Sequence, residues 1–297
     1  MANGMTEAVR VGVVGGSGLY RLSELRDARE IEVGTPFGPP SDAFRVGTIG
    51  GVPAAFLARH GRHHHLLPGE VNYRANIWAL KQLGVERLIA ASAVGSLREG
   101  IAPRHVVTAD QFIDRTRSRS STFFGAGLVA HVALADPVCV DLRGVLSAAL
   151  RDEGGTVHEG GVYVCMEGPG FSTRAESELF RSWGAHIIGM TNFQEAVLAR
   201  EAEICYATMG FVTDYDCWHE DEEDVTVAAL LENLAANAEL ASRTVTQVVS
   251  RLGGRPRSCS CGQALQDAVL TPLSRVPEET LTRLQPILAR FRGESGC

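Results

Sequence analysis

The sequence lacks the features that would place it in a membrane or on a nucleic acid. No apolar run approaches the roughly 20 residues that a helix needs to span a bilayer. There is no block of Lys and Arg, and the formal net charge is −7, which argues against a nucleic-acid partner. The first ten residues carry Asn3 and Glu7 and no apolar core, so they do not resemble a signal peptide. We therefore expect a cytoplasmic protein with no membrane partner.

Several familiar catalytic motifs are missing as well. Gly15-Gly16-Ser17-Gly18 starts like a dinucleotide fingerprint, but Arg21 stands where the third glycine would be, and no Gly-Lys-Ser/Thr follows as in a Walker A loop. There is no Gly-x-Ser-x-Gly elbow of a serine hydrolase. His60 and His64 are four residues apart, yet Gly61 stands where zinc proteases carry Glu. These absences disfavour a serine hydrolase, a dinucleotide enzyme and a zinc protease.

The seven cysteines show no complete metal or disulfide pattern. Five are scattered, and buried free thiols are the expected state of those in strands: Cys139, Cys165, Cys205, Cys217 and Cys297. Cys259 and Cys261 form a Cys-x-Cys pair, which either closes into a small strained disulfide or stays reduced. Two thiols are too few ligands for a structural zinc site. Both states of the pair therefore remain open.

Short apolar runs alternate with amphipathic stretches along most of the chain. This alternation predicts an α/β fold: a single domain with a mixed, mainly parallel central sheet flanked by helices. We expect strands over 9–14, 54–58, 87–94, 106–109, 162–166, 186–190 and 204–212, and helices over 71–83, 143–151, 173–183, 194–202 and 225–251. The pattern changes after Gly253-Gly254. We therefore assign 8–252 to the main domain and 253–297 to a C-terminal extension whose last helix is interrupted at Pro286.

Nearly every predicted strand runs into a small polar cluster. In open α/β sheets, ligands bind at the carboxyl ends of the strands. Six such clusters, drawn from across the chain, therefore predict one shared site. They are residues 15–18, 59–62, 92–96, 167–172, 190–192 and 213–216.

The last of these clusters carries two carboxylates one residue apart. Asp214 and Asp216 follow the apolar run Ile204–Val212. Burying two carboxylates side by side pushes at least one of them toward the neutral form. A neutral acid can protonate a ring nitrogen as its bond to a sugar breaks. Taken alone, the motif fits equally well a loop whose carboxylates are solvated or cap the next helix.

Other clusters suit an anion and an aromatic ligand. Arg59 and His60 offer donors for a phosphate, and Arg can grip it with two hydrogen bonds. Hydroxyls at further strand ends would complete the cradle, although each could equally cap a helix: Ser17, Ser92 and Thr191. Phe171 and Met190 would line a purine or a sugar, with core packing as the alternative.

Taken together, the motifs resemble those of the trimeric purine nucleoside phosphorylases, and within them the members that act on 5′-methylthioadenosine. The resemblance runs from about Val11 to Arg251 and rests on residues 15–19, 59–62, 71–76, 95–97, 110–114, 167–169 and 213–218. It implies phosphorolysis of 5′-methylthioadenosine to adenine and 5-methylthioribose 1-phosphate, in methionine and purine salvage. It also implies inorganic phosphate as co-substrate, no metal or organic cofactor, and a homotrimer, with a dimer of trimers left open.

The resemblance assigns roles to individual residues. Phosphate binding is implied for Ser17, Arg59, His60, Ser92, Ala93 and Thr191. Binding of the nucleoside is implied for Phe171, Ser172, Met190, Asp214 and Asp216, of which the two aspartates are catalytic. Val227 and Leu231 match apolar positions near the 5′ substituent, and His131 matches a residue lent by a neighbouring subunit. Asp214 stands where 6-oxopurine members carry Asn, which favours adenine because a carboxyl group suits N6 and N7.

Three departures from the family pattern affect the site or the tail. Gly170 replaces an Arg, Asn192-Phe193-Gln194 replaces a stretch that ends in Pro, and the segment after Gly253 extends beyond most members. Some archaeal relatives carry a Cys-x-Cys tail, which implies a disulfide between Cys259 and Cys261. The alternative functions are a broader phosphorylase for adenosine or 6-oxopurine nucleosides, a nucleoside-binding protein without turnover, and a metal hydrolase using His60 and His64.

Overall fold

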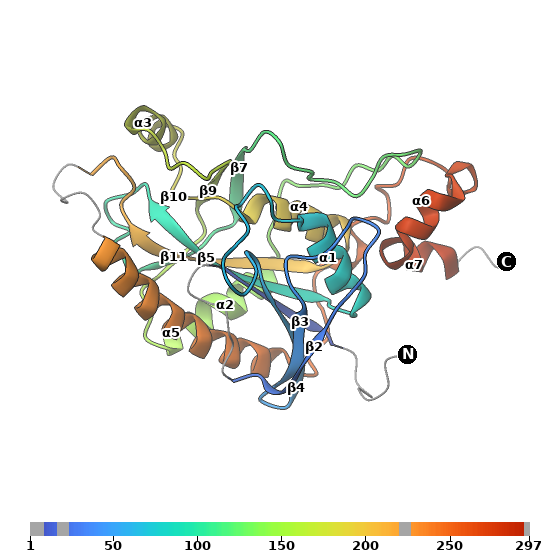
Figure 1. The fold of residues 1–297 in the computed structure, drawn as a ribbon, viewed down its shortest axis with the longest axis horizontal. Helices are drawn as coiled ribbons and strands as arrows, with labels where there is room; N and C mark the ends of the chain where they lie inside the picture. The colour runs from blue at the N-terminus through green and yellow to red at the C-terminus, as the bar shows by residue number, and fades with distance from the viewer. Residues whose placement is uncertain (1–8, 17–23, 220–226, 294–297) are drawn as a thin grey trace.

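The computed structural model describes residues 9–16, 24–219 and 227–293. Within these residues the chain forms one sheet of eleven strands with helices on both faces (Figure 1). This single mixed sheet confirms the predicted fold class. None of the described helices combines the length and the apolarity that crossing a bilayer requires.

Four parallel strands form the centre of the sheet. In order of pairing they are β4 (Val52–Ala58), β1 (Val11–Gly15), β5 (Arg87–Ser96) and β11 (Cys205–Asp214). All four were predicted from their apolar runs. They are mostly apolar at successive positions because helices cover both faces of the sheet.

The other strands extend this centre on both sides. Beyond β4 lie β3 (Phe44–Ile49) and β2 (Arg26–Ile31), both antiparallel. The far end of β5 is continued by β10 (Ile187–Gly189), β9 (Val162–Met166) and β7 (Gln111–Arg115). On the other side, β6 (Val106–Thr108) pairs with β11, and β8 (Val157–Glu159) pairs with β6. The prediction missed β2, β3, β7 and β8. Five of the six residues of β2 are exposed, so hydrophobic patterning contains no signal for it.

The helices cover the two faces in pairs. On one face lie α1 (Tyr73–Gln82) and α4 (Asn192–Glu201), and on the other α2 (Val140–Asp152) and α5 (Val227–Leu252). Alternate strand residues supply the two cores, because successive side chains point to opposite faces. Thus Val14 packs with α1 and α4, whereas Val13 packs with α2 and α5. A further helix, α3 (Arg174–Ser182), lies near β9 and β10 at the end of the sheet (Figure 1).

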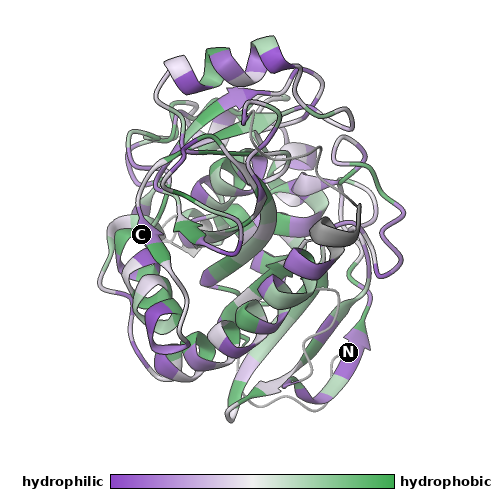
Figure 2. Ribbon diagram, turned by 90° about the vertical axis from the view of Figure 1, so that its left-hand side faces the viewer, coloured by the Kyte–Doolittle hydropathy of each residue, from purple (hydrophilic) through white to green (hydrophobic). Residues whose placement is uncertain are grey.

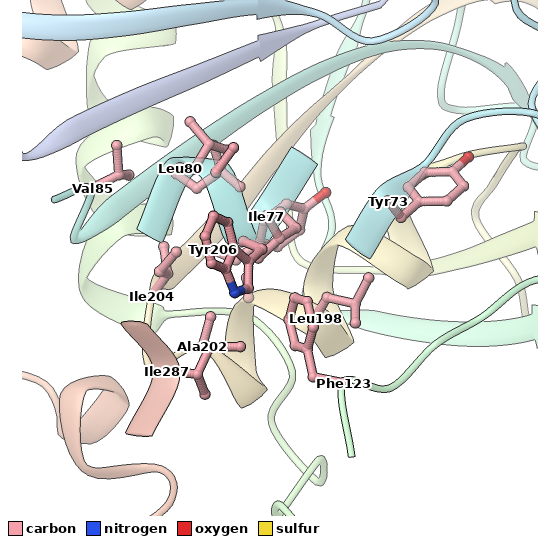
Figure 3. Packing of buried hydrophobic residues seen from close by; sticks show 14 of the residues in the cluster. Tyr73, Ile77, Leu80, Val85, Phe123, Leu198, Ala202, Ile204, Tyr206 and Ile287 are labelled. Atoms are coloured by element: carbon pink, nitrogen blue, oxygen red, sulfur yellow. The ribbon is translucent and has the colours of Figure 1, made fainter. Parts of the chain in front are cut away.

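The central strands are mostly hydrophobic, whereas the helices around them carry many hydrophilic residues (Figure 2). Figure 3 shows the core under α1, where Ile77 and Leu80 meet Tyr206 of β11 and Leu198 of α4. The same cluster includes Ile287 from the C-terminal segment. The C-terminal segment therefore contributes to the main core.

The described part of the C-terminal segment contains four short helices. They are η1 (Ser260–Gln263), η2 (Leu273–Arg275), α6 (Glu278–Arg283) and α7 (Gln285–Gly293), of which α7 packs against α1. The predicted interruption near Pro286 is confirmed, since α6 ends just before it and α7 starts at the residue that precedes it. Leu265, Leu284 and Leu288 are fully buried in the core that α1 shares. The boundary at residue 253 stays a prediction.

Glu201 near the end of α4 is a buried carboxyl whose ionisation should destabilise the fold. The Thr122 hydroxyl and the Phe123 N–H each donate to it at 2.7 Å, yet burial dominates and raises its pKa to about 7. Because this pKa lies above the ordinary 4.5, the stabilisation is complete below about pH 4.5 and is lost as the pH rises through about 7.

We therefore expect Glu201→Gln to remove much of the pH dependence of stability in this range, up to about 3 kcal/mol of unfolding free energy. Urea unfolding at about pH 5 and pH 8 measures the difference. The exposed Glu178→Gln on α3 is the matched control. A Glu201→Gln protein that loses stability with pH as steeply as the parent would contradict this account.

Candidate functional site

The site begins at a gap beside β5. β1 pairs with β5 only as far as Gly15 and Ala91, and β10 begins to pair at Gly95. Between these points no described strand covers this edge of β5. The Ala91 carbonyl accepts from Gly16 N–H at 3.0 Å, and backbone groups alternate between the two edges of a strand. The N–H of Ala93 therefore faces the gap. The polar cluster 92–96 therefore lies inside β5, not after it, and of its five residues only Ala93 is partly exposed.

Arg59 follows β4 and is fully buried. Its Nε and Nη2 donate to the two carboxylate oxygens of Glu195 at 2.5 and 3.0 Å, and its Nη1 donates to the Ala91 carbonyl at 3.0 Å. Burial opposes the charge, but Glu195 outweighs it and raises the pKa of Arg59. The sequence suggested a strongly cationic cluster. In the structure the charge is paired, and two of the five N–H donors of the guanidinium remain.

A Cβ on Gly16 would lie 2.6 Å from Arg59 Nη1. Only glycine therefore lets the loop after β1 pass this close to the guanidinium. The segment that follows, including Ser17, lies outside the described residues. The structure thus brings the start of the first predicted cluster against the second.

His60 is nearly buried and sits in a tight turn. Its Nδ1 lies 2.9 Å from the Leu66 carbonyl, so Nδ1 donates and Nε2 is left as an acceptor. Burial and then Arg59 lower the pKa of His60 to about 4, so the ring is neutral at pH 7. The His64 ring stacks on it at 4.6 Å. Among the described residues, no group of three or more potential metal ligands includes either ring.

The hydroxyls expected at the anion site lie at the same gap. Ser92 is buried and donates to Asn192 Oδ1 at 2.6 Å. Thr191 is the residue before α4, and its side chain makes no capping hydrogen bond. The Thr191 hydroxyl is therefore not used as a helix cap, whereas the backbone N–H groups of Thr191 and Phe193 already contact Tyr163 and Cys165.

The acid pair lies where β11 departs from regular pairing. The register of β11 against β5 shifts between Val212 and Asp214, and such bulges commonly re-aim side chains beside active sites. A Cβ on Gly95 would lie 3.1 Å from Asp214 Oδ1, which places Asp214 against β5 two residues beyond Ala93. The anion gap and the acid pair therefore share one wall.

The two carboxylates differ in their surroundings. Asp214 accepts from the Thr213 hydroxyl at 2.6 Å and from the Asp216 N–H at 2.8 Å. Asp216 adopts a left-handed backbone (φ 55°), and its Oδ2 is buried without a hydrogen-bond partner among the described residues. Burial raises the pKa of Asp216, and the charge of Asp214 adds to the effect. The expected shift of one acid toward the neutral form is thus found at Asp216.

The loop after β9 contacts both Met190 and the segment that follows the acid pair. A Cβ on Gly168 would lie 2.7 Å from Met190 Sδ, so the loop packs closely on that thioether. The Ser172 carbonyl accepts from Cys217 Sγ at 3.4 Å, one residue past Asp216. Phe171 is 82% exposed. The structure therefore brings Ser172 and Met190 to the site and leaves the Phe171 ring in solvent.

Arg119 is a buried residue beside the site that sequence patterns did not reveal. Its guanidinium is almost fully buried and donates to the carbonyls of Met190 and Glu167. It also reaches Glu167 Oε1 and Gln194 Oε1, both at 3.2 Å. Arg119 thus ties the loop after β9 to the loop after β10. It lies in the segment after β7, and no local pattern marks it out.

The residues that depart from the family pattern are accommodated in the structure around the site. A Cβ at Gly170 would meet nothing within 4 Å, so the missing Arg leaves no packing defect. Asn192 and Gln194 are fully buried. Asn192 donates to Tyr206 and Thr208 at 2.7 and 2.9 Å. These side chains form a layer behind the site instead of facing a ligand.

The residues expected at the 5′ pocket are not assembled in the chain as described. His131 is exposed, and its N–H donates to the Ala268 carbonyl at 2.9 Å in the C-terminal segment. Val227 starts the helical backbone of α5, but the side chains of Val227 and Leu231 lie outside the described residues. Further along α5, Asn233 and Asn237 donate to the last carbonyls of β11 at 2.9 and 3.0 Å. α5 therefore supports the acid pair from behind.

Comparisons with known proteins agree on the family. Residues 10–252 match the phosphorylase superfamily. The chain is 55% identical over 285 residues to the S-methyl-5′-thioadenosine phosphorylase of Thermosynechococcus vestitus, covering 95% of this chain and 99% of that protein. It is also 55% identical over 282 residues to the S-methyl-5′-thioadenosine phosphorylase of Geobacter sulfurreducens, covering 95% of this chain and 98% of that protein.

Solved structures give the same result. A methylthioadenosine phosphorylase from an antarctic soil metagenomic library superposes with a TM-score of 0.91 at 46% identity, covering 95% of this chain and 99% of that one. A methylthioadenosine phosphorylase from Schistosoma mansoni in complex with adenine superposes with a TM-score of 0.82 at 35% identity, covering 91% and 99%.

Proposed function

Because the chain belongs to the phosphorylase superfamily, we propose that it catalyses phosphorolysis of 5′-methylthioadenosine to adenine and 5-methylthioribose 1-phosphate. The observation that carries this proposal is the shared wall of the site. Ala93, whose N–H borders the gap, and Gly95, whose Cβ direction meets Asp214 Oδ1, are two residues apart on the same face of β5. An anion and a protonatable base can therefore approach the same sugar from two ends of one strand segment.

The phosphate would occupy the gap beside β5. It would take the two remaining N–H donors of Arg59, the N–H of Ala93 and the hydroxyl of Thr191, with Ser17 completing the site. The hydroxyl of Ser92, which now donates to Asn192, would turn its hydrogen to the anion. Neutral His60 would accept the P–OH hydrogen at Nε2. The buried Arg59–Glu195 pair has no net charge. The dianion is therefore held mainly by directed dipoles, which keeps its oxygens nucleophilic.

The acid pair would act on the leaving base. As the C1′–N9 bond breaks, positive charge builds on the sugar and negative charge on the purine. Asp214 and Asp216 would share a proton with N7 and accept from the N6 amino group, and the unpartnered Oδ2 of Asp216 suits that amino group. A phosphate oxygen forms the new C1′–O bond. In balance, the hydrogen of HPO₄²⁻ ends on adenine.

The remaining contacts follow the family pattern. Phe171 and Ser172 would hold the purine, Met190 the ribose, and Val227 and Leu231 the methylthio group. No metal or organic cofactor takes part in these steps. We also propose a cytoplasmic location and a role in methionine and purine salvage.

Initial rates test this function directly. With 5′-methylthioadenosine, adenine release should depend on inorganic phosphate and be faster than with adenosine or inosine. Rates that favour inosine would support the broader phosphorylase instead. Release without phosphate would support a hydrolase, and tight binding without turnover a binding protein.

The assembly follows from His131. Its described contacts are with the C-terminal segment, so within one chain it does not join the acid pair. We propose a homotrimer in which each His131 serves the 5′ pocket of a neighbour. Specific activity should then fall together with the trimer fraction on dilution, as followed by light scattering. A fully active monomer would refute the shared pocket.

A further inference from the structure

Four thiols from three distant parts of the sequence meet in one cluster. The Sγ atoms of Cys139, Cys205, Cys259 and Cys261 all lie within 4.8 Å of one another. Three of these cysteines are buried and Cys259 is half-buried. In the sequence alone, Cys139 and Cys205 are scattered thiols and the Cys-x-Cys pair has too few ligands around it. The fold corrects that interpretation, because it places the Cys-x-Cys pair beside Cys139 and Cys205. We propose that these four cysteines form a structural zinc site.

The spacing of the sulfur atoms fits a tetrahedral ion. With Zn–S bonds of about 2.3 Å, tetrahedral geometry places the sulfurs roughly 3.8 Å apart. The cluster is compatible with this value, since Cys205 and Cys259 are 3.3 Å apart and no pair of sulfurs is more than 4.8 Å apart. A disulfide requires about 2.05 Å. The observed separations therefore suit four ligands around one ion, and four thiolates with no open position are typical of a structural site.

The surroundings can balance the charge of a zinc tetrathiolate, which is formally −2. Arg200 Nη1 lies 3.9 Å from Cys261 Sγ. Arg87 and Arg257 line the small hollow beside Cys139, Cys205 and Cys259. Cationic hydrogen-bond donors of this kind orient thiolate ligands and lower their repulsion.

The site lies far from the proposed chemistry. Cys205 starts β11 and Asp214 ends it, and nine steps at about 3.3 Å each separate them by roughly 30 Å. The ion would instead join three elements: the residue before α2, the start of β11 and the C-terminal segment. That segment in turn holds the chain around His131, since Val269 bridges Ala130. The metal would therefore fasten the C-terminal segment onto the main core.

Metal analysis of the full chain tests the proposal. The protein should be purified anaerobically with a reductant and without a metal-affinity column, equilibrated with zinc and desalted. About one zinc per chain is expected. Cys259→Ser/Cys261→Ser should lose the zinc, and its Tm should fall by at least about 5 °C. Cys165→Ser removes an equally buried thiol outside the cluster and should keep the zinc.

A second measurement keeps the proposal testable if the double variant does not fold. Cobalt(II) added to the zinc-free parent protein should give the intense visible bands of a tetrahedral thiolate complex, and zinc should displace them. Three results would overturn the proposal: a reduced parent protein that binds neither ion, iron in place of zinc, or mass spectra showing that Cys139, Cys205, Cys259 and Cys261 are paired as disulfides in the anaerobic preparation.

Discussion

Replacing Asp214 by Asn should lower turnover of 5′-methylthioadenosine by about 100-fold or more, the range expected for loss of a general acid. The variant should still fold, because Asn can satisfy the local contacts of the carboxylate. Its Oδ1 would accept from the Asp216 N–H, and its amide would donate to the Thr213 hydroxyl, which now donates to Asp214 at 2.6 Å. The loss is then one of chemistry and base recognition.

Inosine provides the matched comparison for this variant. An amide can serve O6 and a protonated N7, so Asp214→Asn should harm inosine turnover less than that of 5′-methylthioadenosine. The ratio of kcat/KM for the two nucleosides is the readout. Near-normal rates on 5′-methylthioadenosine would show that Asp214 is not the partner of N7.

Asp216 adds a pH test of the same pair. Its pKa is raised by burial and by Asp214, so its protonated form is lost only as the pH rises through that raised pKa. If this proton is used, kcat for the parent enzyme falls on the alkaline side of that value. Asp216→Asn should abolish this limb of the profile. An unchanged limb would place the proton elsewhere.

The central strands, and the position expected for the site, could be predicted because the signals for both lie in residues that are adjacent in the sequence. The runs that became β1, β5 and β11 are apolar at successive positions, and this pattern needs no partner to be recognised. The rule that ligands bind at the carboxyl ends of strands then brought Arg59, Thr191 and Asp214 together. Both inferences depend only on residues that are neighbours in the sequence.

The missed features all depend on pairing between distant segments. Glu195 neutralises Arg59 from 136 residues away, and nothing near either residue announces the pair. Arg119 is one arginine among many in the printed sequence until the fold surrounds it with carbonyls. The thiol cluster joins residues more than 100 positions apart, so spacing rules for zinc motifs cannot find it. Ser92 was placed at a strand end, because sequence does not show where a neighbouring strand stops.

The pairing of Arg59 with Glu195 sets up the second large effect. Arg59→Met alone leaves a buried carboxylate without its partner, which should destabilise the protein by about 3–5 kcal/mol. Its activity would therefore report on folding as much as on phosphate. The double variant Arg59→Met/Glu195→Gln removes both charges together. The glutamine amide oxygen could still accept from the Tyr206 hydroxyl, which now donates to Glu195 at 3.0 Å.

We expect the double variant to unfold in urea close to the parent, while its KM for phosphate rises by about 100-fold or more. The increase reflects the loss of two N–H donors directed at the charged anion, each contributing roughly 1.5–3 kcal/mol. The KM for 5′-methylthioadenosine should change little, because neither residue is proposed to touch the nucleoside. Glu195→Gln alone is the control: it leaves the buried Arg59 unpaired, so it should unfold earlier than the parent in urea without phosphate, yet it should bind phosphate at least as well as the parent. If the double variant is stable and still saturates at the phosphate concentration of the parent, Arg59 holds the fold around the gap and does not bind the anion.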